Sequence, residues 1–112
     1  MASQIDIQEP FKRITAEEAK RLIEQGGAQL IDVREQMEWN QGRIANATLV
    51  PLNALLARPT QYLKEDNIIF YCAEGIRSAV ACEMAAAVGF EKLYNLEGGI
   101  NAWTKQGLPV ER

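Results

Sequence analysis

The sequence NIIFYCAEGIRS, residues 67–78, decides the fold. Its first half is apolar and rich in β-branched and aromatic residues, with no alternation of polar and apolar positions. Such a run is typical of a strand buried on both faces at the centre of a parallel sheet. Its second half contains a glycine and leads directly into a helical pattern. A strand, a tight loop and a helix are therefore predicted in succession.

Strand and helix patterns alternate on both sides of this stretch. Further strands are predicted near residues 11–14, 29–33, 47–50 and 92–96. One helix opens with a capping box formed by Thr15 and Glu18, and a second, residues 77–88, is rich in small side chains and ends at Gly89. This alternation predicts an α/β fold, with a central, mostly parallel five-stranded sheet and helices on both faces.

Length and composition predict one globular domain over residues 11–110, preceded by a flexible lead-in over residues 1–10. The chain has 112 residues, of which 47% are hydrophobic and 24% charged. The net charge of −3 argues against a nucleic-acid partner. No apolar run approaches the ~20 residues of a membrane helix, and the first residues lack the pattern of a secretory signal. We expect a cytoplasmic protein with no membrane partner.

The chain contains two cysteines and no histidine. This excludes Ser-His-Asp and Cys-His catalytic pairs, His-ligated metals and a structural zinc site with four Cys or His ligands. No metal or cofactor is expected, and two cysteines without a secretory signal favour a reducing compartment. A nucleophile here must ionise without an imidazole, which a cysteine can do on backbone N–H groups and a helix N-terminus.

Cys72 and Cys82 are expected to differ in role. Cys72 ends the predicted central strand, where ligands bind in open α/β sheets, and the following loop and helix would direct N–H groups at its sulfur. We expect the pKa of Cys72 to lie below that of an ordinary thiol; the alternative is a buried cysteine that merely ends a strand. Cys82 lies among alanines in a helix and is expected to pack on the sheet, without a disulfide to Cys72.

Four motifs occur in the order typical of one known family. They are Asp32-Val33-Arg34; Glu38-Trp39 followed by Gly42-Arg43-Ile44; Cys72 to Ser78, of the form Cys-x-x-Gly-x-Arg-Ser; and Leu96 to Trp103, followed by Gly107 to Val110. Over residues 11–110 the chain resembles a single-domain rhodanese, a thiosulfate sulfurtransferase-like protein. The resemblance implies the rhodanese-like α/β fold and sulfurtransferase activity.

The resemblance also implies site residues. Cys72 is the nucleophile that carries a persulfide sulfur, held by the backbone N–H groups of a loop that comprises Ala73, Glu74, Gly75, Ile76 and Arg77. Three residues would support the site: Asp32, Arg34 and Ser78. Asp32 is expected to brace the loop, or alternatively to cap the next helix, and Arg34 to pair with Glu38. Arg77 is expected to anchor the loop through an ion pair.

The implied reaction moves a sulfane sulfur through a Cys72 persulfide to a nucleophilic acceptor such as cyanide or a thiol. The donor would be thiosulfate or a small-molecule or protein persulfide; a protein acceptor is a further candidate partner, and a monomer is expected. One alternative is a non-catalytic rhodanese-like binding or regulatory module. Another is a Cys-dependent phosphatase, whose Cys-x5-Arg motif is one residue longer than residues 72–77.

Two positions depart from the family pattern. Arg43 stands where the motif usually has a histidine, at a position that is usually structural. Glu74 stands in a loop where members that use thiosulfate tend to carry basic residues. The sequence therefore predicts a loop that repels the thiosulfate dianion.

Overall fold

The computed structural model describes residues 8–112, and its centre is a five-stranded sheet in which every strand pair is parallel. The strands occur in the order β1-β5-β4-β2-β3. Their bounds are β1, Lys12–Ile14; β2, Gln29–Asp32; β3, Thr48–Leu49; β4, Ile68–Tyr71; and β5, Leu93–Leu96. The predicted α/β fold is therefore confirmed. Residues 1–7, most of the predicted lead-in, lie outside the described part.

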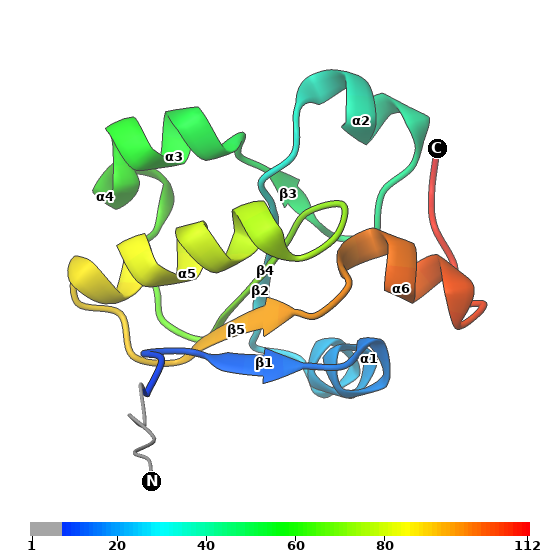
Figure 1. Cartoon of the computed structure of the whole chain (residues 1–112), viewed down its shortest axis with the longest axis horizontal. Helices are drawn as coiled ribbons and strands as arrows, with labels where there is room; N and C mark the ends of the chain where they lie inside the picture. The colour runs from blue at the N-terminus through cyan, green and yellow to red at the C-terminus, as the bar shows by residue number, and fades with distance from the viewer. Residues whose placement is uncertain (1–7) are drawn as a thin grey trace, which may run out of the picture.

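Helices cover both faces of the sheet (Figure 1). They are α1, Ala16–Gln25; α2, Gln36–Gln41; α3, Leu52–Ala57; α4, Pro59–Tyr62; α5, Ile76–Ala87; and α6, Gly99–Lys105. Residues of α3 and α5 pack in one apolar cluster, and residues of α1 and α6 pack in a second. In β4, Ile68 and Phe70 belong to the first cluster and Ile69 and Tyr71 to the second, so this strand is buried on both faces as predicted.

The helix ends follow local sequence signals, with one exception. Thr15 and Glu18 form the predicted capping box at the start of α1. After α5, the N–H groups of Gly89 and Phe90 donate to the carbonyls of Ala86 and Ala85, which is the Schellman arrangement. The exception is Pro59, which follows the end of α3, where proline is common. It also begins α4, because proline lacks only an N–H that the first helical turn does not use.

Parallel strands direct their carboxyl ends to one edge of the sheet, which brings distant segments together. β2 leads to Arg34, β4 leads to Cys72, and β5 leads to Gly98 and Gly99. This edge is where open α/β sheets bind ligands. Within residues 8–112, no helix has both the length and the apolar character needed to cross a bilayer.

Candidate active site

Cys72 lies at the end of β4, at the base of a short loop that leads into α5. Its Sγ receives the N–H of Gly75 at 3.1 Å and the N–H of Ser78 at 3.4 Å. Gly75 adopts a left-handed conformation (φ 96°) that turns the chain into the helix, so a glycine is suited to this position. The loop and the first turn of α5 thus place backbone donors around the sulfur. One donor, Ser78, lies just beyond the predicted range 73–77.

These donors favour the thiolate form of Cys72. The side chain is only 1% exposed, and burial by itself raises the pKa of the thiol. Hydrogen bonds from the Ser78 hydroxyl and from the N–H groups of Ser78, Glu74 and Gly75 act in the opposite direction and outweigh it. The pKa of Cys72 is therefore below its ordinary value, as the sequence predicted.

Cys82 has the opposite environment. It is fully buried in the apolar cluster beneath α5, and this burial raises the pKa of its thiol well above the ordinary value. Both cysteines are unpaired thiols. Cys82 therefore packs on the sheet as expected and is a poor nucleophile.

Asn95 is a site residue that the sequence analysis missed. It lies on β5, is fully buried, and contacts the Ser78 hydroxyl with its Oδ1. Its Nδ2 donates to the carbonyl of Gly75 at 3.0 Å and to Glu97 at 3.1 Å. The one available signal was an amide side chain within the otherwise apolar sequence Leu93-Tyr94-Asn95-Leu96.

Arg77, in the first turn of α5, forms an ion pair with Glu38 of α2. Its two terminal nitrogens each lie 2.9 Å from a carboxylate oxygen of Glu38, and both side chains are about one-third exposed. The Arg77 guanidinium holds the pKa of Glu38 at about 2. The pair joins the loop that follows β4 to the helix that follows β2.

The structure corrects the expectations for Asp32 and Arg34. Arg34 does not pair with Glu38; its side chain binds both carboxylate oxygens of Asp32 and the carbonyl of Gly42. Asp32 neither braces the active-site loop nor caps α2, because its carboxylate accepts the N–H and the guanidinium of Arg34. Arg34 and Asp32 pair because they lie close together in a buried place: the Arg34 side chain is 6% exposed and that of Asp32 is 0% exposed. Each charge neutralises the other inside the protein.

The start of α6 closes on the active-site loop. The N–H groups of Ile100 and Asn101 donate to the carbonyls of Cys72 and Ala73 at 2.9 and 3.1 Å. A Cβ atom on Gly99 would lie 2.4 Å from the carbonyl oxygen of Cys72, so only glycine allows this approach. Trp103, on the same helix, is buried in the core.

Arg43, which replaces the usual histidine, lies on the loop after α2. Its guanidinium lies over the Trp39 ring, 4.9 Å from the centroid, and donates to the Trp39 carbonyl. Its backbone pairs with Glu111 near the end of the chain. Arg43 therefore holds α2 and the C-terminal segment together.

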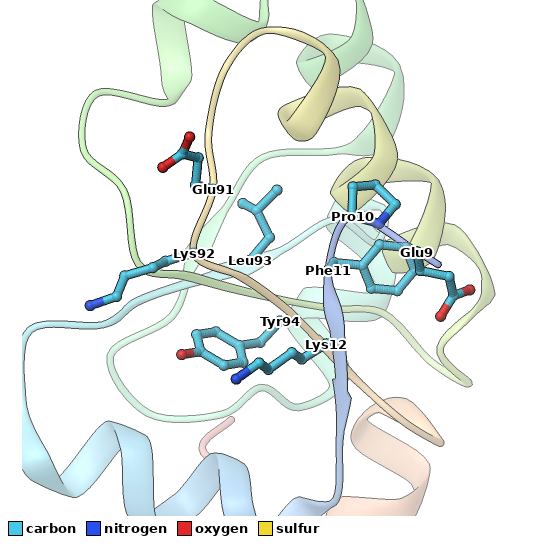
Figure 2. Close-up of a pocket in the computed structure, with 8 residues that line it drawn as sticks. All are labelled: Glu9, Pro10, Phe11, Lys12, Glu91, Lys92, Leu93 and Tyr94. Carbon is cyan, nitrogen blue, oxygen red and sulfur yellow. The ribbon is translucent and has the colours of Figure 1, made fainter. Parts of the chain in front are cut away.

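Two hollows border the loop, and a third lies at the other end of the sheet. A hollow of about 280 Å³ includes Ala73, and one of about 570 Å³ includes Glu74; Asn101 and Thr104 line both. The third, of about 440 Å³, is formed where β1 and β5 begin (Figure 2). It is lined by Glu9, Pro10, Phe11, Lys12, Glu91, Lys92, Leu93 and Tyr94 and contains no cysteine. The two hollows at the carboxyl ends of the strands border the loop that follows Cys72, through Ala73 and Glu74, although Cys72 itself lines neither of them.

The sequence and fold of this chain are similar to those of several known proteins. Residues 15–106 match the family described as the rhodanese-like domain. A protein named sulfurtransferase from Allochromatium vinosum is 34% identical over 82% of this chain and 86% of its own. The thiosulfate sulfurtransferase GlpE of Vibrio cholerae is 28% identical over 90% of this chain and 95% of its own. Among solved structures, a rhodanese-related protein from Thermoplasma volcanium matches with a TM-score of 0.79 and 31% identity, covering 89% of this chain and 97% of its own.

Proposed function

Because this chain belongs to the rhodanese-like domain family, we propose that it is a sulfurtransferase whose Cys72 carries the sulfur in transit. The observation that carries the proposal is the set of hydrogen-bond donors aimed at the Cys72 sulfur, which lowers its pKa without an imidazole. A thiolate of this kind is the form of cysteine that attacks sulfur.

The first half-reaction loads Cys72. Its thiolate attacks the sulfane sulfur of a donor, a new S–S bond forms, and the bond between that sulfur and the rest of the donor breaks. The electron pair leaves with the donor remainder, which is sulfite if the donor is thiosulfate. In the second half-reaction, cyanide or a thiolate attacks the outer sulfur, the S–S bond breaks, and its electron pair returns to Cys72. No external oxidant or reductant is needed.

The loop N–H groups serve both half-reactions. They stabilise the thiolate before attack and again when it is regenerated as the leaving group. Because Cys72 is only 1% exposed, a small donor or one that presents its sulfur on a narrow arm suits the site. A reducing compartment such as the cytoplasm would keep both cysteines as thiols between turnovers.

A Cys-dependent phosphatase is the weaker candidate. Such enzymes need an arginine that is available to clamp the phosphate oxygens. Here both terminal nitrogens of Arg77 bind Glu38, and the loop is one residue shorter than the Cys-x5-Arg motif. The Arg77–Glu38 pair therefore favours a loop anchor over a phosphate clamp.

Comparison of the two cysteines tests the proposal. Cys72→Ser should abolish thiocyanate formation from cyanide with every sulfur donor, because the sulfur has no other carrier. Cys82→Ala, a matched change at the second buried thiol, should retain most of the activity. Intact-mass analysis after incubation with thiosulfate or with a persulfide should show one added sulfur atom on the wild type and none on Cys72→Ser. A protein that takes up no sulfur from any donor would instead be a non-catalytic binding module.

A further inference from the structure

A buried chain of polar atoms leads from the Cys72 sulfur through Ser78 to Asn95. The side chains of Ser78 and Asn95 are both fully buried. The Cys72 Sγ lies 3.4 Å from the Ser78 hydroxyl oxygen, and this hydroxyl also contacts the Oδ1 of Asn95. The chain therefore joins the active-site loop, the first turn of α5 and strand β5.

Two acceptors fix the orientation of the Asn95 carboxamide. Its nitrogen faces the Gly75 carbonyl at 3.0 Å and a Glu97 carboxylate oxygen at 3.1 Å. Both of these oxygens only accept hydrogen bonds, so the nitrogen must face them and Oδ1 must face Ser78. Because an amide oxygen cannot donate, the hydroxyl hydrogen of Ser78 points to Asn95 while Cys72 is a thiol, and a lone pair of Ser78 then faces the sulfur.

A serine hydroxyl has one hydrogen and cannot donate it to two acceptors at full strength. While Cys72 is a thiol, its S–H donates to Ser78, and Ser78 donates to Asn95. When the thiol loses its proton to solvent, Sγ becomes an acceptor, and the Ser78 hydrogen must turn toward it. The Oδ1 of Asn95 then loses its donor, which carries a cost in a buried site.

We propose that Asn95 is a positioning residue that competes with the Cys72 sulfur for the hydrogen of the Ser78 hydroxyl. The inference rests on the proposed function, in which Cys72 changes between a thiolate and a persulfide. When the acceptor bonds to the outer sulfur and the S–S bond breaks, the electron pair remains on Sγ, and Ser78 turns its hydrogen to the new thiolate. When Cys72 is loaded again, its inner sulfur is a weaker acceptor, and the hydrogen returns to Asn95.

Charged groups also surround the hydrogen-bonded atoms of Cys72, Ser78 and Asn95. Their charges must not change in a test, because each could itself shift the pKa of Cys72. Arg77 of α5 lies close enough to Cys72 for the thiolate to raise the pKa of the guanidinium, although Glu38 of α2 contributes more. Glu97 adjoins Asn95, and its partner Arg13 lies on β1. Further charged groups near this end of the sheet are Glu74 in the loop, Lys105 of α6 and the Asp32–Arg34 pair at the end of β2. Uncharged substitutions at Ser78 and Asn95 leave all of these charges in place.

The test measures the alkylation of Cys72 by iodoacetamide against pH, with Cys82→Ala as the common background. It needs no sulfur donor, so its outcome is independent of whether the protein transfers sulfur. Below the midpoint of the pH profile, Ser78→Ala should slow alkylation about two- to tenfold, the range expected for one lost hydrogen bond. Asn95→Ala should accelerate it by a similar factor, because Ser78 then has no second acceptor.

The double variant gives the decisive comparison. Asn95→Ala combined with Ser78→Ala should match Ser78→Ala alone, since Asn95 acts through Ser78. If Asn95→Ala instead slows alkylation whether or not Ser78 is present, Asn95 only holds the Gly75 carbonyl and the proposal is wrong. An unchanged profile in Ser78→Ala overturns it as well.

A second measurement uses the protein with Asn95 in place, so the proposal can be tested even if Asn95→Ala does not fold. The side-chain amide signals of Asn95 in NMR spectra should shift with pH at the midpoint of Cys72 ionisation. Most of this shift should be absent in Ser78→Ala, which breaks the chain of hydrogen bonds. Signals that do not respond to Cys72 ionisation in the wild type would overturn the proposal.

Discussion

The pKa values of the two buried thiols in this protein are shifted in opposite directions, because different atoms surround each sulfur. Cys72 is surrounded by N–H groups and a hydroxyl, whereas Cys82 is surrounded by the apolar cluster beneath α5. Burial raises the pKa of both thiols, and only Cys72 has donors that outweigh it. At the scale of single residues, the direction of hydrogen-bond donors thus decides which thiol has the lower pKa.

Glu74 belongs to the same scale, because its exposed carboxylate lies in the loop that a donor must approach. Glu74→Lys should increase kcat/KM for the thiosulfate dianion about tenfold to hundredfold at low salt. The basis is a charge interaction of ~1 kcal/mol in water to ~4 kcal/mol at an effective dielectric of 20, for charges 4 Å apart. Transfer from an uncharged persulfide donor should change little, and added salt should reduce the gain. Steady-state kinetics with both donors at two ionic strengths measure these effects.

Glu65→Lys is the matched control for this charge change. Glu65 is exposed and precedes β4, so it lies toward the opposite end of the sheet from the loop. It should leave thiosulfate kinetics nearly unchanged. Equal gains from both variants would mean that net charge, rather than the loop, controls donor capture.

At the scale of elements, the active-site loop is held from the outside by the start of α6. This contact depends on Gly99, where an added Cβ would lie 2.4 to 2.5 Å from backbone atoms of Cys72 and Ala73. Gly99 also has a φ of +59°. The first turn of α6 and the loop after β4 can therefore approach each other only while this position lacks a side chain.

Gly99→Ala should destabilise the protein by about 2–5 kcal/mol, because backbone strain and a steric clash add together. Sulfur transfer per folded molecule should also fall, since the loop must move away from α6. Gly107→Ala provides the comparison, because Gly107 has a similar positive φ of 79° but open space where the Cβ would be. It should cost about 1–2 kcal/mol and leave transfer unchanged. Urea unfolding and initial rates measure the two effects; equal losses of activity would show that the contact with α6 is irrelevant.

At the scale of the whole molecule, the Glu38–Arg77 pair links the segments that follow β2 and β4. Because the pair is about one-third exposed, its contribution to the free energy of unfolding is nearer ~1 kcal/mol than the several kcal/mol typical of a fully buried pair. The pair also gives a pH dependence, since the folded-state pKa of Glu38 lies at about 2, below the ordinary value of 4.5. Its stabilisation is therefore present above pH 4.5 and is lost as the pH falls toward 2.

Glu38→Gln isolates this charge, because glutamine can still accept the N–H of Glu35 in the capping box at α2. The variant should be less stable than the wild type by ~1 kcal/mol at neutral pH, and the difference should disappear near pH 2. Urea unfolding from pH 7 to pH 2 measures it, with Glu65→Gln as a control at an exposed glutamate. A stability difference that stays constant with pH would contradict the assignment of the charge pair.

The order of strands and helices and the position of the candidate nucleophile followed from local patterns in the chain. The apolar run of β4, the Thr15 capping box and the glycine after α5 each act over a few residues, so the sequence alone was enough to place them. Cys72 followed in the same way, as the residue between a central strand and a glycine loop. Local pattern did not separate α4 from α3, because Pro59 is equally suited to the end of one helix and the start of the next.

The partners of the polar side chains were decided by the tertiary structure. Arg34 had both Asp32 and Glu38 within local reach, and the position of Arg77, on a distant segment, determined that Glu38 pairs elsewhere. Asn95 reaches Ser78 because β5 lies beside β4 in the sheet. Such contacts depend on strand order and helix placement, and many different pairings satisfy the same local pattern. Packing selects among them, because a buried charge or amide is stable only where the fold brings it a partner.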